Sequence, residues 1–205
     1  MNYQASWGKI NNERLAMIRQ YFTQGKLLDI GSANSAYVGY LRERGKKAFG
    51  IDLHLKPHLP HHIVGNVLSL PFRDKTFFVS TAFNILEHVD DQQLLREIKR
   101  VTSTFVLISV PLKQKDFMHE YGLAFHPYVD PTHLRYYDPG EFLAYVQSQG
   151  FAVVQAYSTL PINPLGLFLK MLRIPWLNKV KAKKIMKLPF IEKFYTTFHC
   201  ILKIQ

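Results

Sequence analysis

The sequence is poor in several features that mark whole classes of proteins. Its 205 residues contain one cysteine, Cys200, so neither an internal disulfide nor a thiolate metal cluster is expected. It has no run of 18 apolar residues, and residues 1–17 lack the apolar segment of a signal peptide. We therefore expect a cytoplasmic protein with a single domain, since this length suits one sizeable core.

Acidic residues are scarce in the last part of the chain. Residues 160–205 hold nine lysines and arginines but one acid, Glu192, so +8 of the net charge of +11 belongs to these 46 residues. The preceding 159 residues carry only +3. A charge distribution this uneven gives information about what the protein binds and not about its fold.

The most informative stretch lies between Lys26 and Leu53. A short apolar run ends in a turn of small residues at 31–35, a helical stretch follows, and a second strand ends at Asp52. This arrangement suits a nucleoside, because backbone N–H groups at a helix N-terminus bind one end of the ligand and a carboxylate binds the ribose hydroxyls. Asp52 follows Asp29 by 23 residues, close to the spacing of about 20 expected for a ribose-binding acid.

Residues 29–35, DIGSANS, resemble motif I of the class I S-adenosylmethionine-dependent methyltransferases, written D-x-G-x-G-x-G. Ala33 and Ser35 stand where that motif has its second and third glycines. Neither the G-x-G-x-x-G of dinucleotide binders nor the G-K-[ST] of triphosphate binders is present here. The resemblance continues in register to about residue 158, through GNVLSLPF, a Leu-Glu-His signature at 86–88, and the helix and strand that follow.

The order of the expected elements predicts an α/β fold. Short strands alternate with helices, which favours a parallel sheet with helices on both faces. The expected strands are 26–30, 47–51, 62–65, 77–82 and 104–110, and the expected helices are 9–24, 34–44 and 91–101. Asp138-Pro139-Gly140-Glu141 then starts a helix that stops at Gly150, and residues 151–157 form a sixth strand.

The resemblance implies a Rossmann-like, mostly parallel seven-stranded sheet whose last strand is antiparallel and lies between the fifth and sixth. Residues 194–204 suit that strand, being β-branched and aromatic, and a helical tail is the alternative. The chain 1–205 then forms one methyltransferase domain with four parts. These are a helical leader (1–25), a cofactor-binding core (26–157), a basic, apolar helical insertion (158–193) and a final strand (194–205). The insertion would leave the sheet at its carboxyl edge, where ligands bind in open α/β sheets.

The resemblance also implies S-adenosylmethionine as the cofactor, S-adenosylhomocysteine as its product, and a set of contacts. The first strand and its turn would hold the methionine and ribose, and the acid after the second strand would bind the ribose hydroxyls. Its neighbour and two residues after the third strand would meet the adenine, and a residue after the fourth would lie near the methionine end. The residues of the first strand and its turn are Asp29, Gly31, Ser32, Ala33 and Ser35, and the ribose-binding acid is Asp52. The adenine contacts are Leu53, Asn66 and Val67, and the residue near the methionine end is Asn84. Asn66 stands where the family usually has Asp.

A hydroxyl acceptor would need a base, whereas an amine or a carbanion-like carbon needs less help. The segment HPYVDPTHLRYYDP resembles the family's stretch before the last helix of the body. In it, His133 is the predicted base and Asp130 orients it, unless His133 only packs the loop. His88 is a further catalytic candidate, although a structural hydrogen bond is its simpler role. The histidines and acids at 119–133 lack an H-E-x-x-H or CxxC pattern, so we expect no metal.

Candidates for substrate contact are aromatic or histidine residues near the expected site. They are Tyr3, Trp7, His126, Tyr136 and Trp176. The two in the leader either close over the cofactor or cap the core. Residues 164–193 mix lysines with large apolar residues, as an interfacial membrane helix does. The alternatives are that this segment covers the core with its lysines in solvent, or that it binds nucleic acid.

The sequence therefore predicts a methyltransferase that acts on a small-molecule, glycan or lipid-linked acceptor. If the insertion binds lipid, its partner is an anionic membrane surface, at the inner face of the membrane. An RNA methyltransferase that docks through the insertion is an alternative, disfavoured because N/D-P-P-[YFW] does not follow the fourth strand. A non-catalytic module that keeps the S-adenosylmethionine-binding fold as a scaffold is another. The retained Asp52 argues against it, because a module that no longer bound the nucleoside would not need that carboxylate.

Overall fold

The computed structural model describes the chain in five stretches. They are residues 10–34, 36–54, 61–113, 130–162 and 194–205. The strands are β1 (Lys26–Ile30), β2 (Lys47–Asp52), β3 (His62–Val64), β4 (Phe77–Phe83), β5 (Thr102–Pro111), β6 (Phe151–Ile162) and β7 (Phe194–Ile204). The helices are α1 (Asn12–Tyr21), α2 (Ala36–Arg42), α3 (Asp91–Val101), α5 (Pro139–Ser148) and the short 3-10 helix η2 (Leu86–His88).

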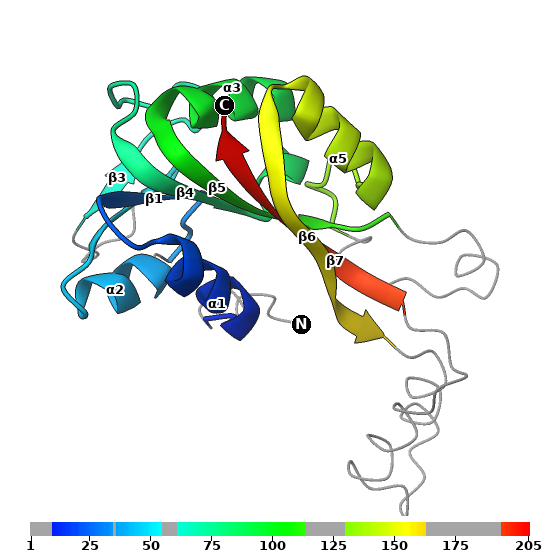
Figure 1. The fold of residues 1–205 in the computed structure, drawn as a ribbon, viewed down its shortest axis with the longest axis horizontal. Helices are drawn as coiled ribbons and strands as arrows, with labels where there is room; N and C mark the ends of the chain where they lie inside the picture. Colours follow the sequence, from blue (N-terminus) through cyan, green and yellow to red (C-terminus); the bar gives the residue numbers. More distant parts are fainter. Residues whose placement is uncertain (1–9, 35, 55–60, 114–129, 163–193) are drawn as a thin grey trace, which may run out of the picture.

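The strands form one seven-stranded sheet in the order β3-β2-β1-β4-β5-β7-β6 (Figure 1). β1 to β5 pair in parallel, and β7 runs antiparallel to both β5 and β6. This confirms the predicted mostly parallel sheet and the predicted place of residues 194–204 as an antiparallel strand between the fifth and sixth. The strand order reverses between β1 and β4, the position in an open α/β sheet where ligands bind outside the carboxyl ends of the strands.

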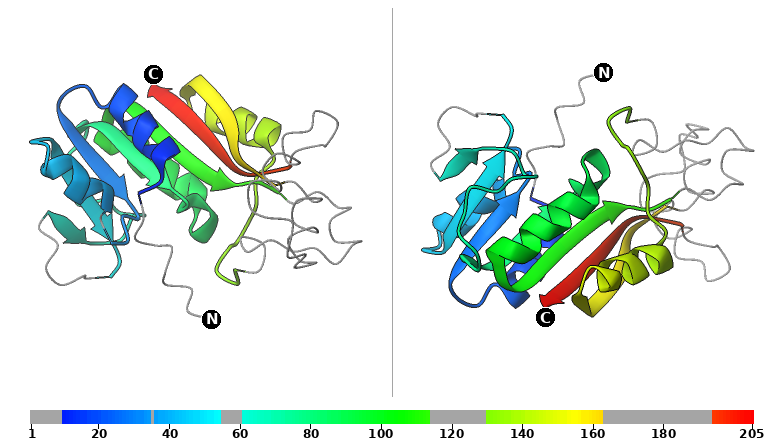
Figure 2. Two further views of the ribbon diagram at one scale, coloured as in Figure 1. Left: turned by 90° about the horizontal axis from the view of Figure 1, so that it is seen from below. Right: turned by 90° about the horizontal axis from the view of Figure 1, so that it is seen from above.

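Helices cover both faces of the sheet (Figures 1 and 2). α1 and α2 lie on one face, and α3 and α5 lie on the other. Two clusters of buried apolar side chains correspond to these faces. Because both faces are covered, the central strands are buried along most of their length rather than on alternate residues: in β1 only the first residue, Lys26, is exposed.

The helices on the second face begin where the sequence places their caps. Asp90 caps α3 by accepting a hydrogen bond from the backbone N–H of Gln93, and Asp138 caps α5 by accepting from Gly140 and Glu141. One side of α3 presents Leu94, Leu95, Ile98 and Val101 to the core, and all four are buried. Their 3- and 4-residue spacing is that of an amphipathic helix, and α3 spans the predicted 91–101.

The sixth strand is longer than the sequence pattern suggested. β6 continues from Phe151 through Ile162, so residues 158–162 belong to the sheet and not to the insertion. The cause is its partner, because β7 pairs with β6 as far as Ile162 opposite Phe194. A register shift between Val153 and Gln155 breaks the strict alternation that marks a strand in a sequence. No described helix is long and apolar enough to cross a membrane.

Candidate active site

A cavity of about 320 Å³ opens at the carboxyl ends of β1, β4 and β5. Its lining comes from α1, the turn after β1, α2, the segments after β4 and β5, and the start of β7. The lining residues include Arg14, Asp29, Gly31, Ala33, Tyr37, Phe83, Asn84, His88, Asp130 and His133. The topology therefore collects polar side chains from distant parts of the sequence at the edge where a parallel sheet binds its ligands.

The turn after β1 is held against the end of β2. The N–H groups of Gly31 and Ser32 both donate to the carbonyl oxygen of Ile51, at 2.9 and 3.1 Å. Gly31 has a φ of +68°, and a Cβ at this position would lie 3.0 Å from the side chain of Ile85, so the turn requires glycine. Ala33, which replaces the second glycine of the motif, also has a positive φ of 45°, a region that side chains other than glycine adopt at a cost.

Asp52 lies at the end of β2, beside this turn. Its Oδ2 accepts a hydrogen bond from the N–H of Ala33 at 2.9 Å, and its Oδ1 accepts from the N–H of His54 at 3.3 Å. Leu53 is 59% exposed, which suits an apolar side chain that packs on a ligand. Asn66 is exposed and its Oδ1 accepts from the N–H of Leu68 at 2.9 Å.

Val67 differs from its expected environment. Its side chain is 3% exposed and packs in the apolar core under α3 and α5, so only its backbone could reach an adenine. None of Asp52, Leu53, Asn66 and Val67 lines the cavity. They lie at and after the ends of β2 and β3, on the other side of the turn from α1.

Arg14 of α1 crosses the cavity toward the end of β4. Its Nη2 donates to Oδ1 of Asn84 at 2.7 Å, and its guanidinium lies 5.1 Å from the ring centroid of Phe83. Asn84 has a φ of +53°, a conformation that asparagine tolerates better than most residues. Burial lowers the pKa of Arg14, while Tyr37 and the carboxylates of Glu87 and Asp29 act in the opposite direction.

Two buried carboxyl groups flank this arginine. Burial raises the pKa of Asp29 to about 6, opposed by a hydrogen bond from Thr81 and by the charge of Arg14. Burial likewise raises the pKa of Glu87 to about 8, and here Arg14 again favours the ionised form. The side-chain oxygens of Glu87 make no hydrogen bond with any described residue, which is costly for a buried polar group.

The predicted catalytic residues lie together in the lining of the cavity. Nε2 of His133 lies 3.7 Å from Oδ2 of Asp130, and the rings of His88 and His133 are 4.7 Å apart in an edge-on arrangement. Thr132 links the group, since its hydroxyl donates to Asp130 at 2.6 Å and lies 2.9 Å from Nδ1 of His88. The hydrogen bonds from Thr132, and then the charges of the two histidines, lower the pKa of Asp130.

The other predicted contacts divide into two groups. The ring of Tyr136 lies 5.5 Å from that of His133, but Tyr136 lines a separate surface hollow beside α3 and α5 rather than the cavity. The second group lies outside the described residues, as does the segment 163–193 with its expected membrane or nucleic-acid contacts. It consists of Ser35, Tyr3, Trp7, His126 and Trp176.

The sequence reasoning did not identify Arg14, Glu87 or Thr132 as parts of the site. A signal for Arg14 was available, because it precedes Met17 and Ile18 by three and four positions and therefore shares their buried helix face. Glu87 sits in the Leu-Glu-His signature, but its full burial depends on residues 130–135 folding over η2. That contact is between segments more than 40 residues apart, and no local pattern reports it.

Comparisons with known proteins agree with this geometry. Residues 28–104 match the methyltransferase domain family. An uncharacterized protein of Methanocaldococcus jannaschii is 28% identical over 110 residues, which are 51% of this chain and 49% of that protein. The match thus spans about half the length of this curated relative.

Three solved structures share the fold at low identity. A methyltransferase from Archaeoglobus fulgidus superposes with a TM-score of 0.63 at 19% identity, over 94% of each chain. Phosphoethanolamine N-methyltransferase 2 of Haemonchus contortus, solved with S-adenosylmethionine, gives 0.61 at 14%, over 94% of this chain and 52% of that one. Geranyl diphosphate C-methyltransferase of Streptomyces coelicolor, solved with S-adenosylhomocysteine, gives 0.59 at 11%, over 95% and 77%.

Motif I ends in a turn held against Asp52, and the last strand lies antiparallel between the fifth and sixth, as the resemblance implied. The family match covers residues 28–104, and the shared fold covers 94% of the chain. Residues 28–104 thus match the methyltransferase domain family, which implies S-adenosylmethionine as the cofactor, and the fold around them is that of solved S-adenosylmethionine-dependent methyltransferases.

Proposed function

We propose that this protein transfers a methyl group from S-adenosylmethionine to a hydroxyl group of a small-molecule, glycan or lipid-linked acceptor. The observation that carries the proposal is the cavity itself. One wall is the turn of motif I, and the opposite wall is the cluster of His88, Asp130 and His133. A cofactor bound at the first wall would direct its reactive end toward the second.

The residues around the turn fit the nucleoside part of the cofactor. Asp52 is ionisable and half-buried, and each of its oxygens accepts one backbone hydrogen bond, which leaves lone pairs for ribose hydroxyls. Leu53 presents an exposed apolar surface next to it. Asn66 offers an amide to the edge of the adenine. The backbone at Gly31 carries no side chain, so a ligand can approach it closely.

Arg14 fits the methionine end of the cofactor, which carries a carboxylate. Its guanidinium lies at the cavity between Asn84 and Phe83 and is partly removed from water. A charge-assisted hydrogen bond in such surroundings is stronger than one at an exposed site. Asn84 positions the guanidinium, and this contact supports the proposal that Asn84 lies near the methionine end.

The opposite wall fits an acceptor that must lose a proton. When bound, the sulfonium of the cofactor supplies an activated methyl group with a neutral leaving group, so the protein has to position the acceptor, exclude water and accept its proton. His133 next to Asp130 and His88 next to Thr132 are the groups that line this end of the cavity and can accept one. An amine acceptor would need no such cluster, and this favours a hydroxyl.

Calorimetric titration with S-adenosylmethionine and S-adenosylhomocysteine tests the cofactor site. We expect micromolar binding to the wild type and a loss of at least about tenfold in Asp52→Ala and Asp52→Asn, because a charge-assisted hydrogen bond contributes about 1.5–3 kcal/mol. Glu43→Ala is the matched control, since Glu43 is exposed and its carboxylate only pairs with Arg44 at 3.6 Å.

Release of S-adenosylhomocysteine then tests the reaction with hydroxyl-bearing acceptors, both lipid-linked and water-soluble. Turnover with a hydroxyl compound, and none with its deoxy analogue, supports the proposal. Failure of the wild type to bind either cofactor form would overturn it and would favour a module that uses the fold only as a scaffold. Binding that survives in Asp52→Ala would show that the ribose contact is assigned to the wrong residue.

A further inference from the structure

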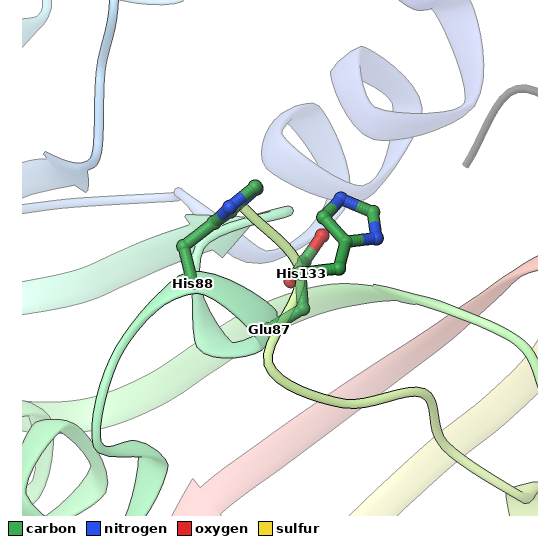
Figure 3. A group of neighbouring side chains, drawn as sticks. All are labelled: Glu87, His88 and His133. Atoms are coloured by element: carbon green, nitrogen blue, oxygen red, sulfur yellow. The ribbon is translucent and has the colours of Figure 1, made fainter. Parts of the chain in front are cut away.

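Glu87 is the least satisfied polar side chain near the cavity. It is 0% exposed, and neither carboxylate oxygen has a hydrogen-bond partner among the described residues. A buried carboxylate in this condition costs free energy unless a charge or a donor compensates for it. Figure 3 shows the carboxylate directed toward the ring of His133, with His88 beside it.

These three side chains are close enough to share one ion. A ligand atom from each of Glu87, His88 and His133 lies within 4.8 Å of the other two. Two ligands on opposite sides of a metal are roughly 4.2 Å apart, since each bond to nitrogen or oxygen is about 2.1 Å long. Small side-chain movements would therefore be enough to bring all three into contact with a metal.

The backbone holds the two contributing segments together. Glu87 and His88 belong to η2, directly after β4, and His133 belongs to the segment before α5. The N–H of Leu134 donates to the carbonyl oxygen of Glu87 at 2.7 Å, so the residue after His133 is fastened to η2. The cluster is therefore part of the folded framework and does not depend on a chance approach of two loops.

His88 has the kind of outer hydrogen bond that metal-binding histidines usually have, and His133 has a carboxylate nearby. Such a histidine typically gives its second ring N–H to a carboxylate, a carbonyl or water. His133 has Asp130 at 3.7 Å, and Nδ1 of His88 lies 2.9 Å from the hydroxyl of Thr132. Because that hydroxyl donates to Asp130, Nδ1 of His88 is the donor to Thr132, which leaves a lone pair on Nε2 of the neutral ring.

We propose that Glu87, His88 and His133 form a site for one divalent first-row transition metal, such as Mn²⁺ or Zn²⁺, at the acceptor end of the cavity. Two imidazoles and one carboxylate are a ligand set that these ions favour, with open positions for further ligands. Asp130 adds a second negative charge nearby, and Arg14 is the positive group that faces Glu87. The cluster differs from the expectation that the chain binds no metal, which considered residues 119–133 alone.

The consequence for the reaction rests on the proposed function. An acceptor hydroxyl that occupies an open metal position loses its proton more easily, because the cation stabilises the alkoxide. The acceptor oxygen would give its proton to Asp130 or to water and form the bond to the methyl carbon. The carbon–sulfur bond would break, with its electron pair staying on sulfur. The two histidines would then be ligands, and the metal would replace the imidazole base.

Titration of tag-free, EDTA-treated protein with Mn²⁺ and Zn²⁺ tests the site. We expect one ion to bind per chain, with binding at least about tenfold weaker in Glu87→Gln and in His133→Asn. His61→Asn is the matched control, because His61 is exposed at the edge of the sheet beside Phe49 and outside the cluster. The absorption spectrum of bound Co²⁺ reports whether imidazole ligates the ion, a signal that a structural role would not produce.

The outcomes separate this inference from the proposed function. No stoichiometric binding to the wild type, or binding that both variants retain, overturns the metal site. Circular dichroism shows whether each variant is folded, and Glu87→Gln is expected to fold because glutamine has nearly the same shape and burial at this position disfavours the charged carboxylate. S-adenosylhomocysteine is titrated into the same metal-free protein. If it binds there while no metal binds, the metal inference fails alone and His133 stands as the base.

Discussion

At the scale of single residues, Arg14 connects the leader helix to the reactive end of the cavity. It belongs to α1, yet its contacts are with Asn84 and Phe83 at the end of β4. It also balances the charges of the two buried carboxyl groups, Asp29 and Glu87. A cation that is partly removed from water forms a strong hydrogen bond with an anionic ligand group, and the carboxylate of methionine is such a group.

Replacing Arg14 with methionine is expected to weaken binding of S-adenosylhomocysteine by about tenfold to hundredfold, as the loss of a hydrogen bond between charged groups does. Adenosine, which lacks the amino acid part, should bind the variant and the wild type alike. Arg19→Met is the control, since Arg19 lies on the same helix but contacts the half-buried ring of Tyr40, which does not line the cavity. Equal weakening for adenosine would show that Arg14 only supports the fold of the site. Isothermal titration calorimetry measures all three proteins.

At the scale of elements, the segment between the end of β5 and α5 sets the place of the acceptor wall. Its last part is fixed from two directions. Arg135 donates to the carbonyl oxygen of Val89 and pairs with Asp91 of α3 at 2.7 Å, while Asp138 caps α5. His133 and Asp130 are held between these anchors, so the start of α5 contributes to the geometry of the cluster.

The cap of α5 can be tested separately. Asp138 accepts hydrogen bonds from the N–H groups of Gly140 and Glu141 at 2.8 and 3.2 Å. Asp138→Ala should lower the free energy of unfolding by about 1 kcal/mol, whereas Asp138→Asn, which keeps the acceptor oxygen, should change it by only a few tenths. Urea denaturation followed by circular dichroism measures both. If Asp138→Asn lowered the free energy of unfolding as much as Asp138→Ala does, the capping role would be contradicted.

At the scale of the whole molecule, β7 brings the end of the chain into the middle of the sheet. Its His199 is 1% exposed, and its two ring nitrogens contact the hydroxyls of Ser109 on β5 and Thr159 on β6, at 2.8 and 2.7 Å. One side chain thus joins three strands. Burial, together with the positive charge of Arg14, lowers the pKa of His199 to about 4.

This histidine should make the stability of the protein depend on pH. Between its ordinary pKa of 6.5 and the folded value of about 4, the unfolded chain binds a proton that the folded chain does not. The contribution of His199 to the free energy of unfolding is therefore complete above pH 6.5 and is lost as the pH falls toward 4. The advantage of the wild type over His199→Gln should shrink by up to about 3 kcal/mol between pH 7 and pH 4.

Denaturant unfolding at several pH values measures that difference. The wild type has to be compared with the variant, because other groups also make the stability depend on pH. Asp29 and Glu87 have raised pKa values, so their contributions to stability are lost as the pH rises, opposite to that of His199. Phe198→Leu is the control, since it is a buried neighbour on β7 that does not titrate. It should be destabilised equally at every pH. A constant gap between wild type and His199→Gln would contradict a depressed pKa.

Most of the fold could be predicted from the sequence, because its causes are local. The 3.6-residue spacing in α3, the capping acids Asp90 and Asp138, and the β-branched run of 194–204 each specify an element within a few residues. The turn of motif I and Asp52 indicated a nucleoside site in the same way. The end of β6 could not be placed, since residues 158–162 are strand only because β7 pairs with them.

The sequence by itself determined the class of fold, the order of its strands and the cofactor family, since each depends on short patterns and their spacing. Only the tertiary structure decided which side chains meet at the acceptor wall. Arg14, Glu87 and His133 come from segments tens of residues apart, and the burial that leaves Glu87 without a hydrogen bond arises when those segments pack together. Burial and long-range contact are properties of the packed chain, and no local periodicity encodes them.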